Sequence, residues 1–308
     1  MIIVIRKEVY FFMEKNSSNK TEKSFHNVPI NWYPGHMAKT KREIKEIIST
    51  VDIVIEVLDS RIPKSSHIED LNSFVMDKKT VLVFNKYDLC DKEKTNKFIN
   101  YYNDLGFDVI TCDSKNTNDF KKIINYVNNF MKEKNQKRYE KGLLNKKANV
   151  LIVGVPNVGK STLINKLAGK NISEIGNKPG VTKSLNKIKI NEYFNLIDTP
   201  GILWPKFKDE ETALNLSSMT TIKESVLPIH KIAIHILEKL NNEYKNILKD
   251  VFNLETFDLD DIEYYYDKIG EYKGILKYRG EPDYDRISEL IVNLIKKEKI
   301  KGVTFDNL

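Results

Sequence analysis

The sequence predicts an α/β protein in which a mostly parallel sheet carries helices on both faces and is followed by a small all-helical domain. From about residue 31 to residue 200, short apolar runs of strand length alternate with stretches of helical length, and such alternation favours parallel strand pairing. The runs are apolar along their length, as in residues 52–58, which is typical of strands buried on both faces. After residue 205, amphipathic helical stripes replace the strand-like runs.

The expected elements of the sheet region follow one another in a regular order. We expect strands at residues 52–58, 81–84, 108–111, 149–153 and 193–197. We expect helices at residues 37–49, 68–77, 92–104, 119–132 and from Ser161 to Leu167. Residues 132–142 are basic and carry no apolar stripe of their own, so we interpret them as a connector between two parts of the sheet.

Two stripes of apolar residues mark helices in the last third of the chain. The first helix is expected to begin near Pro228, a residue that suits a first helical turn. The stripes share the helical spacing i, i+3, i+4 and consist of Ile229, Ile232, Ala233, Ile236, Leu237 and Leu240, then Ile287, Leu290, Ile291, Leu294 and Ile295. Because stripes of this kind are usually core, we predict a small helical domain at residues 206–308.

Composition limits the class of protein further. With 308 residues, of which 41% are hydrophobic, the chain is long enough for about two domains. Residues 1–30 lack helical or strand periodicity and are expected to form a disordered leader, which leaves residues 31–205 for the sheet domain. The net charge of +7 and the pI near 9.0 favour a polyanionic partner such as nucleic acid.

Two cysteines and the hydropathy pattern exclude other classes. Cys90 and Cys112 are not part of a C-x-x-C pair or a histidine cluster, so we expect neither a disulfide framework nor a zinc ribbon. No stretch approaches the roughly 18 apolar residues that a membrane-spanning helix needs. We therefore expect a protein of a reducing compartment without a membrane partner.

The segment Gly154–Ser161 matches the phosphate-binding pattern G-x-x-x-x-G-K-[ST] directly after an apolar strand. Its glycines let backbone N–H groups turn toward phosphates, Lys160 adds a positive charge, and the Ser161 hydroxyl suits magnesium. The helix that follows points its N-terminus at the same anion. The residues that we expect to contact the nucleotide here are Asn157, Val158, Gly159, Lys160, Ser161 and Thr162.

A second pattern, Asn85-Lys86-Tyr87-Asp88, follows the strand at 81–84 and suits a guanine base. The Asp88 carboxylate matches the ring N–H and exocyclic amine of guanine, a donor pair that adenine lacks. Asn85 is expected to brace the loop or to contact the base, and the stem of Lys86 to lie along the base. Ser114 and Lys115, after the next strand, are expected to form a turn over the base.

The order of these two patterns is reversed relative to an ordinary small GTPase. There the phosphate loop opens the domain and the base-reading loop follows, whereas here the base-reading loop comes first. The sequence therefore predicts a circularly permuted phosphate-loop G domain that binds GTP and GDP.

The segment Asp198–Gly201 completes the pattern with a D-x-x-G sequence after the strand at 193–197. Asp198 is expected to hold magnesium through water, and the Gly201 N–H to meet the γ-phosphate. Thr182, in a Pro-Gly-Val-Thr sequence between the two phosphate motifs, is a further candidate magnesium ligand beside Ser161.

The chain resembles the circularly permuted GTPases of ribosome assembly, and within them the ribosome biogenesis GTPase A family. The resemblance covers residues 31–308 and includes Trp32–Lys39, Asp59–Pro63 and Asp198–Phe207. It implies a GTP-hydrolysing factor for late maturation of the large ribosomal subunit, stimulated by that particle, which binds ribosomal RNA partly through its helical domain. We expect a monomer in a bacterial cytoplasm that does not bind DNA; an organelle remains an alternative because residues 1–30 are unexplained.

The catalytic apparatus has a gap that the resemblance fills with two candidates. Regulatory GTPases place a glutamine after the D-x-x-G glycine, but this chain has Ile202, which cannot orient water. By resemblance, Asn157 helps to hold a potassium ion, or else it only braces the loop. By the same resemblance, His36 positions or deprotonates the attacking water, or else it packs the N-terminal segment or contacts RNA.

Two alternative functions stay open at this point. Because Ile202 replaces the usual glutamine, the protein could be a GTP-dependent RNA-binding scaffold with negligible hydrolysis. It could also be a small-subunit assembly GTPase, although proteins of that kind typically add an OB-like domain and a zinc site. Candidate RNA contacts are the basic residues Lys39, Lys41, Arg42, Lys45, those from Lys132 to Lys147, and Lys296, Lys297, Lys299 and Lys301.

Overall fold

The fold is described from a computed structural model, which places residues 35–113, 116–169, 185–201, 209–219, 227–278 and 280–308. Its contacts divide the chain into two compact units. The sheet unit spans residues 30–223 and 301–308, and the helical unit contains residues 224–300. The unit boundaries therefore differ from the predicted boundary at residue 205, because residues 209–219 and the segment after residue 300 belong with the sheet.

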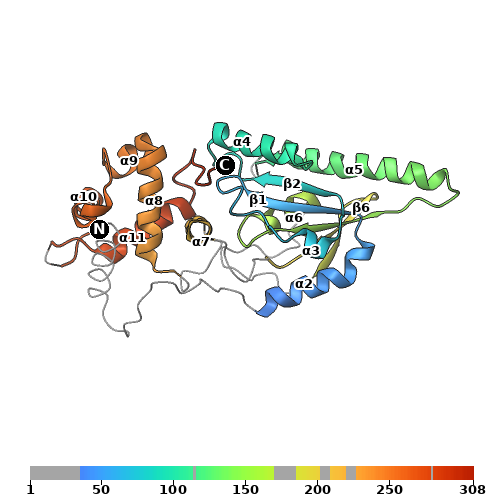
Figure 1. Ribbon diagram of the computed structural model, residues 1–308, viewed down its shortest axis with the longest axis horizontal. Helices are drawn as coiled ribbons and strands as arrows, with labels where there is room; N and C mark the ends of the chain where they lie inside the picture. Colours follow the sequence, from blue (N-terminus) through green and yellow to red (C-terminus); the bar gives the residue numbers. More distant parts are fainter. Residues whose placement is uncertain (1–34, 114–115, 170–184, 202–208, 220–226, 279) are drawn as a thin grey trace. The chain divides into compact units, whose positions relative to one another are not determined.

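A six-stranded sheet in the order β3-β2-β1-β4-β6-β5 forms the centre of the first unit (Figure 1). The strands are β1 (Ile53–Asp59), β2 (Thr80–Asn85), β3 (Asp108–Cys112), β4 (Ala148–Val153), β5 (Asn186–Lys189) and β6 (Phe194–Asp198). The neighbours from β3 to β6 pair in parallel, and β5 pairs antiparallel with β6. The predicted mostly parallel α/β architecture is confirmed.

The register of the parallel strands brings the predicted site to one edge of the sheet. Asp59 at the end of β1 lies opposite Asn85 at the end of β2. Ile152, next to the end of β4, lies opposite Asp198 at the end of β6. Ligands of open α/β sheets bind beyond such carboxyl ends.

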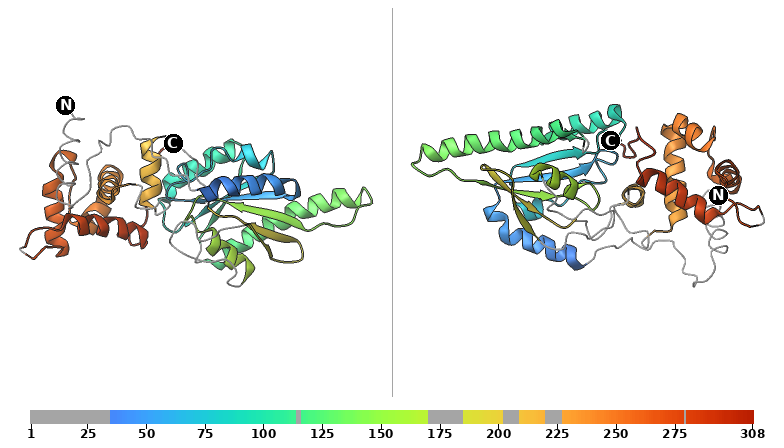
Figure 2. Two further views of the ribbon diagram at one scale, coloured as in Figure 1. Left: turned by 90° about the horizontal axis from the view of Figure 1, so that it is seen from below. Right: turned by 180° about the vertical axis from the view of Figure 1, so that it is seen from behind.

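Helices cover both faces of this sheet. They are α2 (Gly35–Ile47), α3 (Asn72–Val75), α4 (Lys92–Asp104), α5 (Thr117–Tyr139) and α6 (Lys160–Ala168), with a 3-10 turn at Ile48–Thr50. Helix α7 (Glu210–Ser218) belongs to the same unit. Helix α2 packs beside α3, and α5 packs beside α6. Figure 2 shows these two pairs on opposite faces of the sheet.

The predicted end of the helix at residue 132 is wrong, because α5 continues to Tyr139 and makes most of the connector at residues 132–142 helical. The extension is held by polar contacts rather than by an apolar stripe. Lys134 Nζ lies 2.6 Å from Asp52 Oδ1, and Lys146 Nζ reaches the same oxygen at 3.1 Å. Asp52 also accepts from the backbone N–H of Asn149 at 3.0 Å, so one carboxylate ties the end of α5 to the start of β4.

Two other elements differ from the prediction. Strand β5 was not predicted, since Ile188 is its only buried residue and an edge strand of that kind has little apolar signal. The helix expected at 68–77 is reduced to α3, because the preceding residues form turns.

The helical unit confirms the two apolar stripes as core. Its elements are α8 (Ile229–Glu243), α9 (Lys245–Phe252), a 3-10 turn at Leu259–Asp261, α10 (Ile262–Lys273) and α11 (Tyr284–Lys296). Helix α8 packs along α11, and the buried stripe residues are Ile232, Ala233, Ile236, Leu237, Leu240, Ile287, Ile291 and Ile295. In the described part of the chain, no helix has the length and apolar character needed to cross a membrane.

Candidate nucleotide-binding site

The phosphate loop joins β4 to α6 in a backbone conformation that requires its glycines. Gly154 and Gly159 have φ values of +152° and +99°. A Cβ added to Gly154 would lie 2.5 Å from the carbonyl oxygen of Val57, and one at Gly159 would approach the side-chain amide of Asn85 closer than 3.0 Å. Both positions therefore disfavour any larger residue, and the loop lies tightly against β1 and the base-reading loop.

Lys160 lies inside this loop. Its Nζ donates to the carbonyl oxygens of Gly154 at 2.7 Å and Val155 at 2.9 Å. Burial lowers the pKa of Lys160 to about 8, although the charge of Asp198 opposes the shift. A polyphosphate would supply more negative charge, so the buried ammonium is suited to an anionic ligand.

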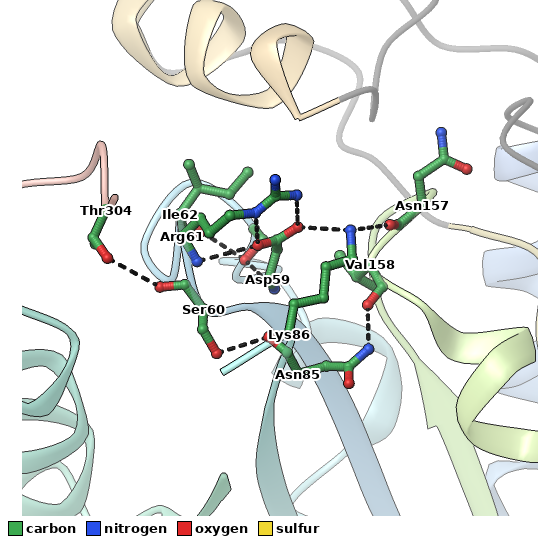
Figure 3. A network of polar contacts seen from close by, with 10 residues as sticks. Asp59, Ser60, Arg61, Ile62, Asn85, Lys86, Asn157, Val158 and Thr304 are labelled. Atoms are coloured by element: carbon green, nitrogen blue, oxygen red, sulfur yellow. Dashed lines mark hydrogen bonds and ion pairs between the residues drawn. The ribbon is translucent and has the colours of Figure 1, made fainter. Parts of the chain in front are cut away.

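The base-reading loop braces the phosphate loop directly (Figure 3). Asn85 Nδ2 donates to the carbonyl oxygen of Val158 at 2.7 Å, and Lys86 Nζ donates to that of Asn157 at 2.9 Å. Of the two roles predicted for Asn85, bracing is present. Its Oδ1 is buried without a hydrogen-bond partner among the described residues, which leaves an acceptor at the site. Asp88 lies two residues beyond Lys86 and is partly exposed.

Asp59 is a member of this site that the sequence reasoning missed. Its carboxylate accepts hydrogen bonds from Arg61 Nε at 2.9 Å and from Arg61 Nη2 at 2.8 Å. Lys86 Nζ lies 2.9 Å from Asp59 Oδ2. Burial by itself raises the pKa of Asp59, but the charges of Arg61 and Lys86 outweigh it and hold the pKa well below its usual range. With 2% of its surface exposed, Arg61 has a structural role in this site.

The D-x-x-G turn reaches the same edge of the sheet. Asp198 is buried at the end of β6, and the Thr199 hydroxyl donates to the carbonyl oxygen of Ile152 at 2.7 Å. A Cβ at Gly201 would lie 2.7 Å from Pro156 Cγ, so this turn touches the phosphate loop. A hydroxyl at Ser161 and a carboxylate at Asp198 are oxygen donors of the kind that magnesium prefers.

Other predicted site residues cannot be placed in this geometry. Ser114, Lys115 and Thr182 lie outside the described residues, as does Ile202. His36 is in the first turn of α2, but its side chain is outside the described part. Their roles stay predictions.

Comparison with known proteins decides the family. A profile of the family described as "50S ribosome-binding GTPase" matches residues 149–259. Ribosome biogenesis GTPase A of Priestia megaterium is 38% identical over 279 residues, which cover 90% of this chain and 96% of that protein. The chain belongs to the ribosome biogenesis GTPase A family. Ribosome biogenesis GTPase A of Thermotoga maritima is 30% identical over 90% of this chain and 94% of its own length.

Solved structures agree with this assignment. The crystal structure of GNP-bound YlqF from T. maritima superposes with a TM-score of 0.60 at 26% identity and covers 87% of this chain and 98% of that one. Its GDP-bound structure gives the same TM-score at 25% identity, with 86% and 99% covered. As a member of the ribosome biogenesis GTPase A family, the chain has a circularly permuted G domain, binds GTP and GDP, and hydrolyses GTP in ribosome biogenesis.

Proposed function

We propose that this GTPase acts in late maturation of the large ribosomal subunit and binds ribosomal RNA in a nucleotide-dependent way. The observation that carries the proposal is the pair of hydrogen bonds from Asn85 and Lys86 to the phosphate loop. They join the two halves of a guanine-nucleotide site in the permuted order of a family that acts in ribosome biogenesis. The description of the matching profile, "50S ribosome-binding GTPase", supports the large subunit as partner.

The test is co-sedimentation with purified large and small subunits, loaded with GDP or a non-hydrolysable GTP analogue. We expect binding to large subunits that is stronger with the GTP analogue, together with faster GTP turnover in their presence. Preferential binding to small subunits would favour a small-subunit assembly factor. RNA binding without measurable turnover would favour a scaffold.

The site residues are assigned the following roles in this proposal. Asp88 selects guanine together with Ser114 and Lys115. The phosphates are held by the Lys160 ammonium and by the backbone of Val158, Gly159 and Thr162. The Gly201 N–H meets the γ-phosphate. Ser161, Thr182 and Asp198 would hold magnesium, which neutralises charge on the phosphoryl oxygens when bound. The contact of Gly201 with Pro156 supports its place beside the phosphates.

Hydrolysis without a glutamine at position 202 needs another source of positioning or charge. We assign potassium binding to Asn157, whose side chain turns away from Lys86 (Figure 3). A monovalent cation there would add positive charge at the phosphoryl oxygens. Replacing potassium with sodium should then lower turnover, and unchanged turnover would remove the ion from the site.

His36 is assigned to the attacking water. A His36→Ala variant should lose most of its subunit-stimulated turnover while its GTP affinity stays the same. Full stimulated turnover would contradict this role and leave packing or RNA contact for His36.

RNA binding is assigned to the basic residues as a set. Some members are engaged within the protein: Lys41 Nζ lies 2.6 Å from Asp70, while Lys134 and Lys146 share Asp52. The remaining lysines should give an affinity for large subunits that falls steeply with salt. An affinity that barely changes between low and moderate salt would contradict this. The protein is assigned as a monomer of the bacterial cytoplasm. Gel filtration tests the monomeric state.

A further inference from the structure

The loop after β1 connects the nucleotide site to a distant part of the chain. We call residues 59–66 the β1 loop. At its start, Asp59 lies between Arg61 and Lys86, and Lys86 continues to the carbonyl oxygen of Asn157 in the phosphate loop (Figure 3). The Asp59 side chain therefore fixes one of the two hydrogen bonds through which the base-reading loop braces the phosphate loop.

The conformation of Lys86 makes this support necessary. Lys86 has a φ of +58°, a left-handed backbone conformation that residues other than glycine seldom adopt. Its ammonium is held between a carboxylate and a carbonyl oxygen, each at 2.9 Å. Without Asp59, the positive charges of Lys86 and Arg61 would face each other with little solvent to screen them.

The other end of the β1 loop is held by residues 303–306, which we call the strap. The Phe305 N–H donates to the carbonyl oxygen of Arg61 at 2.8 Å. The buried Asp306 carboxylate accepts from the N–H groups of Lys64 and Ser65, both at 2.7 Å, and from the Ser65 hydroxyl. It also accepts from Asn215 Nδ2 of α7 at 2.9 Å.

Further contacts of the strap fix the segment that follows the base-reading loop. Thr304 Oγ1 accepts from the N–H of Asp91 at 3.2 Å and lies 2.9 Å from Thr95 Oγ1. The N–H of Gly302, just before the strap, donates to the carbonyl oxygen of Leu89 at 2.8 Å. Leu89 is the residue after Asp88, so these contacts fix the chain directly C-terminal to the guanine-reading segment.

We propose that Asp59 is a positioning residue for guanine-nucleotide binding and that the strap holds it in place. Asp59 acts through Lys86 and does not touch the nucleotide itself. The inference rests on the proposed assignment of Lys86 and Asp88 to the nucleotide site. Because the effect passes through the base-reading loop, it should weaken GTP and GDP by the same factor and change kcat little.

The decisive comparison is between two buried carboxylates of the same strand. Asp59→Asn removes the charge that holds Lys86, whereas Glu56→Gln removes a buried carboxylate that pairs with His67 at 3.0 Å. Both variants should lower stability, but only Asp59→Asn should raise the KM for GTP, by on the order of tenfold. A KM that is unchanged in Asp59→Asn, or raised equally in Glu56→Gln, would overturn the proposal.

A second variant covers the case in which Asp59→Asn does not fold. Arg61→Lys keeps the positive charge but loses the two-pronged contact with Asp59. It should raise the KM for GTP several-fold with kcat retained. A loss of kcat at constant KM would instead indicate a smaller folded fraction and would count against a positioning role.

The strap is tested by Asp306→Ala against Leu308→Ala, which changes a side chain that is 63% exposed. Asp306→Ala should weaken GTP and GDP equally, and Leu308→Ala should weaken neither. The double variant Asp59→Asn/Asp306→Ala should lose less affinity than the product of the single losses, because both act through one loop. Fully independent losses would contradict the link between the strap and Asp59.

An Asp88→Ala variant separates this inference from the site assignment. If Asp88→Ala retains full selectivity for GTP over ATP, the assignment of the base-reading loop fails. If Asp88→Ala loses that selectivity while Asp59→Asn binds GTP normally, only the positioning role fails.

Discussion

Gly159→Ala is the substitution whose cost follows most directly from the geometry. Gly159 has a φ of +99°, so an alanine there is strained by about 1–2 kcal/mol. Its Cβ would also displace the Asn85 amide, which donates to the carbonyl oxygen of Val158 at 2.7 Å. Loss of that hydrogen bond costs about 0.5–1.5 kcal/mol more. The free energy of unfolding of the sheet unit should therefore fall by about 1.5–3.5 kcal/mol.

The matched control is Gly169→Ala at the other end of α6. Gly169 has a φ of +67°, but a Cβ there would have no heavy atom within 4 Å. It carries the conformational strain alone, about 1–2 kcal/mol. The difference between the two variants isolates the Asn85 contact.

Two assays read the comparison. Denaturant unfolding of the nucleotide-free proteins measures stability, and titration with a fluorescent GTP analogue measures affinity. We expect Gly159→Ala to be the less stable variant and to lose at least roughly tenfold in affinity, while Gly169→Ala binds nearly as wild type. If the two variants are equally stable and bind GTP equally well, the brace between Asn85 and the phosphate loop has no energetic weight.

Three further predictions follow from other parts of the molecule. Asp52→Ala should lower the free energy of unfolding by about 1–3 kcal/mol, since it leaves Lys134 and the Asn149 N–H without their acceptor. The GTP affinity should stay unchanged. Thermal unfolding with and without GTP measures the stability and the affinity. Burial lowers the pKa of His67, but Glu56 outweighs it and raises the pKa above 6.5. The pair therefore stabilises fully below pH 6.5 and loses this contribution as the pH rises through the raised pKa, a dependence that unfolding curves of His67→Gln should lack. We expect the GTP affinity of the wild type to depend on magnesium and that of Asp198→Ala not to. A variant whose affinity still responds to magnesium chelation would remove Asp198 from that site.

The parts of the site that could be predicted from the sequence are those formed by residues adjacent in the chain. Gly154–Ser161 and Asn85–Asp88 each follow an apolar strand, so pattern and context occur together in one short stretch. The sheet was predictable for the same reason, because buried parallel strands are continuous apolar runs.

The contacts of Asp59 and the strap could not be predicted in this way. Asp59 meets Lys86 because the register of β1 with β2 sets it opposite Asn85, and that register depends on the whole sheet. The strap contacts the β1 loop partly through backbone N–H groups, which leave no pattern in side-chain types. Helix α5 was predicted too short because its last turns are fixed by Asp52, a residue far away in sequence.

The central pairing of β1 with β4 also sets the order in which the domain becomes complete during synthesis. Translation delivers β1, β2 and β3 first, and β4 follows only after the long helix α5. Until then β1, whose residues are all buried in the finished domain, has one open edge where β4 will pair. Open apolar edges invite pairing with other chains, so the nascent protein passes through an interval of exposure to aggregation. GTP binding cannot shorten that interval, because the phosphate loop follows β4 in the chain and is synthesised after β1 has been exposed.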